Sequence, residues 1–511
     1  MFDDAKSVWE LIERRAAASP DRVMLCAGDR EMTFGAYRDA VEVAAAGWAA
    51  RGVGEGDHVS WQLPTWIESA VLVGALCRLG AIQNPMLPIY RQKEISFITT
   101  QLGTKLLVTP SVWNNFNYHE LATSIVGDRA VVADSWNPDG DPAMLSAAPK
   151  VYDNRSDDPV RWIFYTSGTT SDPKGAQHTD RSVMQAAIGY AKKTHVAEDD
   201  IAIVAFPFTH VGGAIIGVFT PLLTGSTAVL MEAFSPQLTT ELVGRHKVTL
   251  GNGAPAIHQM LIAEAQAHPE AYAHIRAFPG GGSPKPPNQH DEIRAVVPSA
   301  TQGINSGYGL TEAPILTQTD MDARDESKIL GEGTPTESVT IRLVDANGND
   351  VAAGTEGEIV AQGHQIMRGY TDPSLDAAAF TADGFFKTGD IGRFLDDGTV
   401  VITGRIKDII IRKGENVSAK EVEDTLFGHP LIADVAVFGI PDVDRGEMVV
   451  AAIAPKDPAN APDQAAVFEY CKGAGLMLQK IPERIMVLDA LPRNASGKVP
   501  KHELRKQLVG E

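Results

Sequence analysis

The first 300 residues alternate short, apolar, β-rich runs with helical patterns, and this alternation constrains the fold more than any other feature. The runs span residues 22–26, 58–63, 105–109, 161–166, 201–206 and 227–231. A repeated strand–helix–strand order is typical of crossover units around a parallel sheet that is buried on both faces. We therefore predict an α/β fold, and 511 residues are too many for one ordinary core.

After about residue 330 the alternation of strands and helices gives way to consecutive strands. Strands with tight polar turns follow at 339–351 and 357–363, and the Asn347-Gly348 pair is a strong hairpin signal. This indicates a small β subdomain over about 331–403. A last unit of strands (434–440, 448–454, 484–489) and helices (418–428, 501–508) follows the stretch GRIKD. We predict an N-terminal domain over 1–406 and a C-terminal domain over 407–511.

Charge and composition exclude several classes of protein. A formal net charge of −20 argues against a nucleic-acid binder, which needs a basic surface. The three cysteines are far apart, so neither a disulfide framework nor a zinc motif is indicated. The uncharged stretch 201–231 is long enough to cross a membrane, but prolines and glycines divide it, and we read it as strand, helix and strand. The acidic N-terminus is unlike a signal peptide, so we expect a cytoplasmic location.

The loop YTSGTTSDPKG, residues 165–175, follows one of the apolar runs. Small residues with inward N–H groups, hydroxyls and a lysine form a nest for a polyanion, and open α/β sheets place ligands at such a position. We expect this loop to bind a phosphate chain. The alternative is that it is only a flexible turn. The loop is not a Walker loop, because Lys174 precedes Gly175 instead of following a glycine.

Four further motifs follow in order, and with them the chain resembles the adenylate-forming (AMP-binding) superfamily, which includes acyl-CoA synthetases. These motifs are GYGLTE (307–312), KTGD (387–390), GRIKDIIIRKGENVSAKEVE (404–423) and PRNASGK (492–498). Weaker signals lie at FPFTHVGG (206–213), GGGSP (280–284) and GEIVAQGHQIMRGY (357–370). The resemblance implies an α/β fold with two parallel-rich αβα sheets and a small β subdomain in the N-terminal domain, followed by a mobile α+β C-terminal domain.

The resemblance also implies roles in binding ATP and Mg²⁺. Joining a carboxylate to ATP brings two anions together, so the site has to neutralise charge at the α-phosphorus. Thr311 would contact the α-phosphate, Glu312 would bind Mg²⁺, Tyr308 would lie on adenine, and Asp390 would hold the ribose. The remaining nucleotide-binding residues would be Thr166, Ser167, Gly168, Thr169, Thr170 and Lys174 on the phosphates, and Gly281, Gly282, Ser283, Ser306, Gly307, Gly309 and Arg405 elsewhere.

Other roles belong to the acyl and thioester steps. The resemblance makes Lys498 the main catalytic residue of adenylation, although composition alone would make it a solvated lysine. Lys407 would be the hinge of a domain rotation, and Gly414, with Lys413 and Glu415, would line the CoA tunnel. His210, in HVGG, would gate the acyl site, the alternative being a satisfied core histidine. The acyl pocket would be lined by Phe208, Val211, Gly212, Gly303 and Leu310.

Two residues depart from the family's pattern. Ser171 stands where a glycine is most common in the phosphate loop, and Ser306 stands where many relatives carry an amide that contacts adenine. Asn305 or a backbone carbonyl could replace that amide. Residues 206–209 also lack the aspartate that pairs the ammonium group in amino-acid-activating members, so we expect an acid with an uncharged tail.

The function implied is that of an acyl-CoA synthetase for a fatty, aryl or alicyclic acid, with ATP, Mg²⁺ and CoA. The acid would be converted to an acyl-adenylate and pyrophosphate, and the acyl group would then pass to CoA. Expected partners are these small molecules, with no nucleic acid, no stable membrane insertion, and a homodimer left open. Alternatives are loading of a carrier protein, thioesterification of a supplied adenylate, a luciferase-type oxygenase, or a non-catalytic nucleotide-binding protein.

Overall fold

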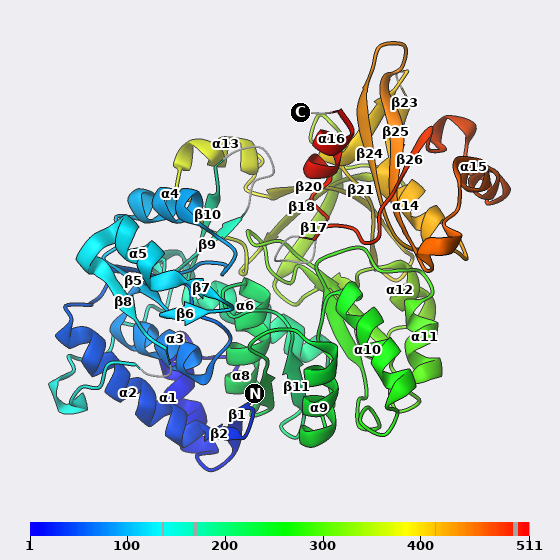
Figure 1. Ribbon diagram of the computed structural model, residues 1–511. Helices are drawn as coiled ribbons and strands as arrows, with labels where there is room; N and C mark the ends of the chain where they lie inside the picture. Colours follow the sequence, from blue (N-terminus) through cyan, green and yellow to red (C-terminus); the bar gives the residue numbers. More distant parts are fainter. Residues whose placement is uncertain (135–136, 167–171, 414, 494–498, 510–511) are drawn as a thin grey trace.

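The computed structural model of the chain describes residues 1–134, 137–166, 172–413, 415–493 and 499–509 (Figure 1). Its largest described sheet has the strand order β19-β10-β9-β4-β3-β5-β8. The strands from β9 to β8 are parallel to their neighbours, whereas β10 turns back and pairs antiparallel with β9. Their bounds are β19 (Gly369–Tyr370), β10 (Lys174–His178), β9 (Trp162–Thr166), β4 (Ile82–Pro85), β3 (His58–Trp61), β5 (Leu106–Thr109) and β8 (Ala130–Val132).

A second sheet has the order β11-β12-β1-β2, and single bridges through Leu250 and Gly253 extend it to a third, ordered β13-β14-β15-β16. The strands β11, β12 and β1 are parallel, and β2 closes a hairpin with β1. The bounds are β1 (Val23–Ala27), β2 (Arg30–Thr33), β11 (Ile201–Val204), β12 (Thr227–Leu230), β13 (Phe278–Gly281), β14 (Ile304–Tyr308), β15 (Thr317–Gln318) and β16 (Thr334–Pro335).

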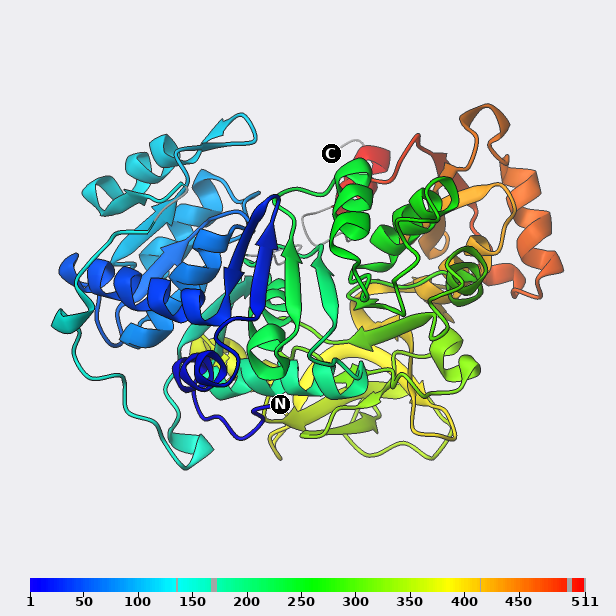
Figure 2. The ribbon, with the colours of Figure 1, turned by 90° about the horizontal axis from the view of Figure 1, so that it is seen from below.

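Helices fill the space between these sheets and cover their outer faces (Figures 1 and 2). The main core cluster takes residues from both sheets and from the helices between them, α1 (Val8–Ala18), α2 (Phe34–Ala50), α3 (Ile67–Leu79) and α6 (Asp180–Lys193). The outer helices are α4 (Gln92–Leu102) and α5 (Tyr118–Val126) on one side, and α9 (Pro236–His246), α10 (Pro255–Ala267), α11 (Gln289–Val296) and α12 (Asp325–Leu330) on the other. Strands that are covered on both faces are expected to be apolar on both faces. This holds for β5, β11 and β12, whereas β4 and β14 carry buried polar residues.

The uncharged stretch 201–231 forms strand, helix and strand, as expected. Its helix consists of α7 (Val211–Ala214), the π-helical turn η4 (Ile215–Phe219) and α8 (Thr220–Thr224). Pro221 has no N–H to donate, so a wide π turn before it fits the sequence. Within the described ranges, no helix combines the length and apolar character that crossing a bilayer requires.

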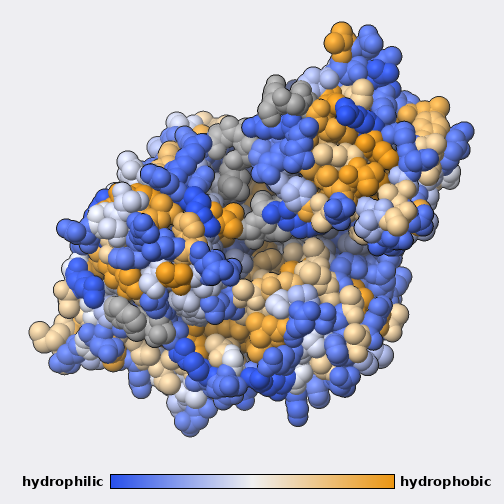
Figure 3. Space-filling model, in the orientation of Figure 1, coloured by the Kyte–Doolittle hydropathy of each residue, from blue (hydrophilic) through white to orange (hydrophobic). Residues whose placement is uncertain are grey.

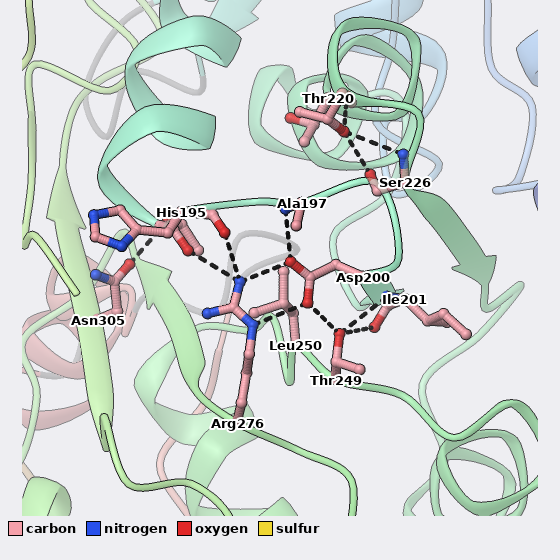
Figure 4. Close-up of polar contacts among 12 residues, drawn as sticks. His195, Ala197, Asp200, Ile201, Thr220, Ser226, Thr249, Leu250, Arg276 and Asn305 are labelled. Carbon is pink, nitrogen blue, oxygen red and sulfur yellow. Dashed lines mark hydrogen bonds and ion pairs between the residues drawn. The ribbon is translucent and has the colours of Figure 1, made fainter. Parts of the chain in front are cut away.

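An ion pair between the half-buried Arg276 and the buried Asp200 connects the starts of the central strands (Figure 4). Arg276 donates to both oxygens of Asp200, at 2.9 and 2.7 Å, and Thr249 donates to Asp200 at 2.7 Å. Burial alone would raise the pKa of Asp200, but these hydrogen bonds lower it overall. Because Asp200 directly precedes β11, this cluster fixes the amino ends of the parallel strands and leaves their carboxyl ends for a ligand.

The β subdomain is an antiparallel sheet, β17 (Val339–Val344), β18 (Gly357–Gly363), β20 (Phe386–Phe394) and β21 (Val400–Arg405). The hairpin turn lies where Asn347-Gly348 predicts it, with Gly348 at φ 82°. Between β18 and β20 the chain returns to the large sheet, where β19 pairs with β10 and Tyr370 lies opposite Ala176. This return brings the subdomain against the end of the large sheet.

The C-terminal part is an α+β unit with strands β22 to β26. It begins after the short turn η6 (Ile406–Asp408) and packs separate apolar clusters on the two faces of its sheet. Ser418 contacts the preceding part, since its Oγ donates to the carbonyl of Thr403 at 2.7 Å. The bounds are β22 (Ile409–Arg412), β23 (Glu415–Ser418), α14 (Ala419–Phe427), β24 (Ile432–Asp442), β25 (Gly446–Pro455), α15 (Gln464–Gly473), β26 (Arg484–Val487) and α16 (Lys501–Val509). The predicted fold class is confirmed, and the boundary at 406 stays a prediction.

Candidate active site

Asp390 lies at the centre of the site, held from two sides. Tyr308, the last residue of β14, donates its hydroxyl to Oδ2 of Asp390 at 2.6 Å, and Nε of Arg405 donates to Oδ1 at 2.7 Å. Tyr308 and Asp390 are buried, and burial followed by the Asp390 charge raises the pKa of Tyr308 well above its usual value. The tyrosine therefore stays protonated as a donor, and three residues from separate strands form one rigid group.

The side chain of Tyr370 lies close to both Lys174 and Glu312. The lysine Nζ lies 5.5 Å from the ring centre of Tyr370, whose hydroxyl donates to Oε1 of Glu312 at 2.9 Å. Thr166 and Lys174 are paired across β9 and β10, so the phosphate loop is the connection of a hairpin. Ser167, Gly168, Thr169, Thr170 and Ser171 lie outside the described residues. The sheet thus brings the loop's two ends to the Glu312 carboxylate.

The backbone of the GYGLTE motif is fixed by residues outside it. Nε2 of His178 contacts the Thr311 carbonyl at 2.8 Å, and the N–H of Met367 donates to the Glu312 carbonyl at 2.8 Å. Burial lowers the pKa of His178 to about 4, so its ring is neutral at pH 7. The sequence analysis did not find His178. Its only signal is its place on the strand that follows the phosphate loop.

The glycines at the end of β13 allow two strands to approach closely. An added Cβ would lie 1.9 Å from the Gly253 carbonyl oxygen at Gly280, and 2.1 Å from that of Gly307 at Gly281. Gly282 has φ +87° but open space around its Cβ position. Ser283 follows and is partly exposed. Gly281 pairs with Gly307, and the nucleotide-binding role of these residues stays a prediction.

Ser306 is buried beside Lys285, which the sequence analysis missed. Lys285 Nζ donates to Ser306 Oγ at 2.9 Å and lies 3.1 Å from Oε1 of Glu332. Asn305 is fully buried and is tied to Thr194 and Gln318 at 3.0 and 2.7 Å. The expectation that Asn305 replaces a missing adenine contact is therefore wrong, because its amide is already used inside the core.

His210 caps the helix of the FPFTHVGG segment. Its Nδ1 accepts a hydrogen bond from the N–H of Gly212 at 3.0 Å, and its ring stacks on Phe206 with centroids 6.0 Å apart. Gly213 lets this helix approach the preceding turn, since a Cβ there would lie 2.0 Å from the Pro207 carbonyl oxygen. His210 is partly exposed, unlike a core histidine.

The predicted acyl-pocket residues are brought together only in part. Phe208 and Val211 are almost fully buried in the main core cluster, and Gly212 next to them is partly exposed. Leu310 packs against the apolar cluster of the β subdomain. Gly303 precedes β14 and lies against His290 of α11, five residues from Tyr308 and thus roughly 16 Å away along the strand. Gly303 therefore lies at the opposite end of β14 from Tyr308, and its place in the acyl pocket stays a prediction.

The C-terminal residues of the predicted thioester step lie around a hairpin turn. Lys407 is exposed in η6, and its side chain makes no hydrogen bond or ion pair with any described residue. Lys413, with φ 51°, and the exposed Glu415 flank the turn between β22 and β23. Gly414 and Lys498 lie outside the described residues. Figure 3 shows the surface hollowed where the C-terminal part meets the rest of the molecule.

Comparison with known proteins identifies the family. The AMP-binding enzyme family model matches residues 12–371, and the model of the AMP-binding enzyme C-terminal domain matches residues 421–498. The chain belongs to the AMP-binding enzyme family, which confirms the resemblance inferred from the motifs.

Relatives and solved structures agree with this assignment. The chain is 29% identical to the medium-chain fatty-acid–CoA ligase of Escherichia coli strain K12, over 100% of this chain and 91% of the relative. It is 30% identical to the salicyl-AMP ligase / salicyl-S-ArCP synthetase of Mycobacterium tuberculosis, over 96% and 88%. The structure of o-succinylbenzoate CoA synthetase from Bacillus subtilis with ATP and magnesium ion is 28% identical, covers 97% and 99%, and has a TM-score of 0.82. The chain is thus an enzyme of the AMP-forming acid–CoA ligase type.

Proposed function

We propose that this enzyme activates a carboxylic acid with an uncharged tail to an acyl-adenylate and then transfers the acyl group to CoA. The observation that carries the proposal is the convergence of Tyr308, Asp390 and Arg405 with Glu312 and Lys174 at one end of the sheets. An aromatic face, a diol-binding carboxylate, a phosphate-binding lysine and a further carboxylate are the groups that an ATP substrate requires.

In the first step the carboxylate oxygen of the acid attacks the α-phosphorus of ATP, and pyrophosphate leaves. Asp390, held by Tyr308 and Arg405, would accept hydrogen bonds from the ribose hydroxyls and so fix the nucleoside. Thr166 and Lys174 would hold the leaving phosphates. Lys498 would place its charge between the α-phosphate and the incoming carboxylate, where it counts most in the transition state.

Glu312 suits a magnesium ion. Its Oε1 is oriented by Tyr370, and its Oε2 has no hydrogen-bond partner among the described residues. A carboxylate oxygen of this kind is the hard ligand that Mg²⁺ prefers, together with substrate phosphates. The ion would neutralise phosphate charge, while His178 and Met367 hold the main chain around Glu312 in place.

The second step forms the thioester, and Lys407 would be the hinge of the domain rotation that it needs. Its exposed side chain has no described partner that a rotation would have to break. Rotation of the C-terminal domain about this residue would bring the turn with Lys413, Gly414 and Glu415 to the acyl-adenylate. The thiol of CoA would then attack the acyl carbon, and AMP would leave with its phosphate.

The acid is proposed to be fatty, aryl or alicyclic. No side chain from Ile201 to Met231 carries a formal charge, with histidine counted neutral, so this wall of the pocket offers nothing to pair with an ammonium group. The E. coli relative takes medium-chain fatty acids by its name, which fits an apolar tail. The salicyl relative is named for transfer to a carrier protein, so a carrier is the alternative acceptor to test.

The proposal is tested by ATP–pyrophosphate exchange with fatty, aryl, alicyclic and amino acids, together with detection of CoA thioesters. We expect exchange with one class of uncharged-tail acid and thioester formation from the same acid. The Lys498→Ala variant should lose exchange, whereas Lys506→Ala, on the following helix, should keep it. Faster exchange with free amino acids would contradict the substrate class, and transfer to a carrier protein without transfer to CoA would contradict the acceptor.

A further inference from the structure

We propose that Cys26, Glu31 and His246 form a binding site for a borderline-soft transition metal, with Zn²⁺ as the natural occupant. Their potential ligand atoms, one from each residue, all lie within 4.8 Å of one another. The site lies on the β1–β2 hairpin and the end of α9, outside every element of the active site described above.

Backbone pairing places two of the donors on one face. Cys26 and Glu31 are opposite each other in the antiparallel β1–β2 ladder, so their side chains lie on the same face of the hairpin. His246 is the last residue of α9, which covers that face. Arg245 donates to Asp29 in the hairpin turn at 2.7 Å, so a separate ion pair holds the helix end against the hairpin. Backbone pairing and a separate ion pair, and not only the conformations of the three side chains, therefore bring Cys26, Glu31 and His246 together.

The Cys26 thiol, the Glu31 carboxylate and Nε2 of His246 have no hydrogen-bond partner in the described part of the chain. Nε2 of His246 is buried without a hydrogen-bond partner, and the Cys26 thiol is free and only 3% exposed. Glu31 makes no hydrogen bond or ion pair with a described residue, whereas the nearby Asp29 is taken by Arg245. A buried nitrogen without a partner is unfavourable, and a cation between the three side chains would satisfy it.

The donor set selects the class of metal. Thiolate, imidazole and carboxylate together suit Zn²⁺, with water as a fourth ligand, whereas Mg²⁺ prefers oxygen alone. Bond lengths of about 2.0 to 2.3 Å to zinc require donor atoms roughly 3.3 to 3.8 Å apart. The exposed side chain of Glu31 and the helix-end position of His246 leave room for that contraction. On binding, the thiol proton of Cys26 leaves to solvent and a sulfur–metal bond replaces it.

A second cluster of potential ligands does not meet the same conditions. His195, Asp320 and Asp322 also lie within ligand distance of one another. Asp320 is already paired with His195 at 3.3 Å, and Lys193 lies 3.7 Å from it. A cation there would compete with a lysine that is already in place.

The expected role of the metal is structural. β2 is an edge strand, and a metal bound to Cys26, Glu31 and His246 would fasten the β1–β2 hairpin to α9. Any ligand that binds only the folded state raises stability, so Zn²⁺ should raise the melting temperature. The ligase reaction does not pass through this site, so the metal proposal and the proposed function can fail separately.

The test is a Co²⁺ titration of the full chain after chelator treatment and removal of the chelator. We expect one equivalent per chain, with thiolate-to-cobalt charge-transfer absorption and intense visible bands of a tetrahedral site, both removed by Zn²⁺. Cys26→Ser should lose the charge-transfer absorption, and Cys26→Ser and His246→Gln should each weaken binding at least tenfold. Cys471→Ser, in the distant α15, should keep the spectrum and the rise in melting temperature with Zn²⁺.

The Glu31→Gln variant covers the case in which a buried variant fails to fold. Glu31 is exposed and makes no described polar contact, so this variant should fold normally and still bind Co²⁺ more weakly. Absence of stoichiometric binding to the wild-type chain would overturn the proposal. A cobalt spectrum and affinity unchanged in folded Cys26→Ser or Glu31→Gln would overturn it as well.

Discussion

Tyr308 and Asp390 lie 82 residues apart in the sequence and are joined by a hydrogen bond of 2.6 Å between the tyrosine hydroxyl and Oδ2 of the carboxylate. Tyr308 ends β14 of the third sheet, whereas Asp390 lies in β20 of the β subdomain. The bond therefore connects the motif expected to contact adenine with the motif expected to hold the ribose. Because both groups are buried, the position of one side chain determines that of the other.

Replacing Tyr308 by Phe should weaken ATP binding without unfolding the chain. The ring remains for adenine, but Asp390 loses a hydrogen bond to a charged group, which contributes about 1.5 kcal/mol. We expect KM for ATP to rise about tenfold in pyrophosphate exchange. Tyr272→Phe, which removes a hydroxyl contact to Thr240 at 3.0 Å away from the site, should leave KM unchanged. An unchanged KM in Tyr308→Phe would show that the Asp390 carboxylate does not need this bond.

Gly280 and Gly282 should differ sharply when each is replaced by Ala. A Cβ at Gly280 would meet the Gly253 carbonyl oxygen at 1.9 Å, whereas Gly282 has open space but φ +87°. Gly282→Ala should lower the free energy of unfolding by roughly 1 to 2 kcal/mol through backbone strain alone. Gly280→Ala should lower it by more, because the two backbone segments must separate. Denaturant unfolding measures both, and equal losses would mean that the close approach at Gly280 relaxes easily.

Lys285 and Glu332 form a largely buried pair that can be tested by a double-mutant cycle. Their side chains are 6% and 15% exposed, and the charged atoms are 3.1 Å apart. Lys285→Met leaves a carboxylate without its partner and should lower the free energy of unfolding by about 3 kcal/mol. The double variant Lys285→Met/Glu332→Leu should recover a large part of that loss.

The exposed pair Lys192 and Glu337 is the matched control for this cycle. Its side chains are 38% and 67% exposed, with the charged atoms 2.6 Å apart. Lys192→Met should change the free energy of unfolding by less than about 1 kcal/mol. A loss in Lys285→Met no greater than that in Lys192→Met would contradict the buried character of the first pair.

Two buried histidines should make the fold sensitive to acid. Burial lowers the pKa of His178 and of His258 to about 4, below the value of an unfolded chain. Between pH 6.5 and pH 4 the unfolded state therefore binds a proton at each of these histidines, whereas the folded state does not. The free energy of unfolding consequently falls as the pH is lowered from about 6.5 toward 4. Each histidine should reduce the free energy of unfolding by about 2 kcal/mol between pH 7 and pH 5.

Unfolding by urea at pH 7 and pH 5 measures this loss. His258→Gln should be less stable at pH 7 but should show a smaller change with pH than the wild-type chain. His268→Gln, a substitution of a surface-exposed histidine, should retain the wild-type pH dependence. Equal pH dependence of His258→Gln and the wild-type chain would mean that His258 titrates normally.

Six of the parallel strands could be predicted from their apolar, β-rich sequences, whereas β4, β8, β13 and β14 were not among the predicted runs. All six runs named at the outset form strands, from β1 near the N-terminus to β12. β10 and β20 could not be predicted in the same way, since β10 reads KGAQH and β20 contains Asp390 and two glycines. Both are strands because their neighbours pair with them, and pairing between distant segments leaves no local pattern.

In the site, too, some residues could be found from a local sequence pattern and others could not. Tyr308, Glu312 and Asp390 were found from short motifs, but His178, Lys285 and Tyr370 act through contacts with residues far away in the sequence. The position of Gly303 has a related cause. The residue was assigned with the loop that contains Tyr308, whereas an intervening strand carries the two to opposite ends of the sheet.

The most direct test of the account is ATP–pyrophosphate exchange followed by CoA-thioester detection, with the same acid panel for the wild-type, Lys498→Ala and Lys506→Ala proteins. The account predicts exchange and thioester formation with one class of uncharged-tail acid, lost in Lys498→Ala and kept in Lys506→Ala. No exchange with any acid, combined with thioester formation from a supplied acyl-adenylate, would contradict it. Such a result would show that the loop carrying Ser171 does not support adenylation.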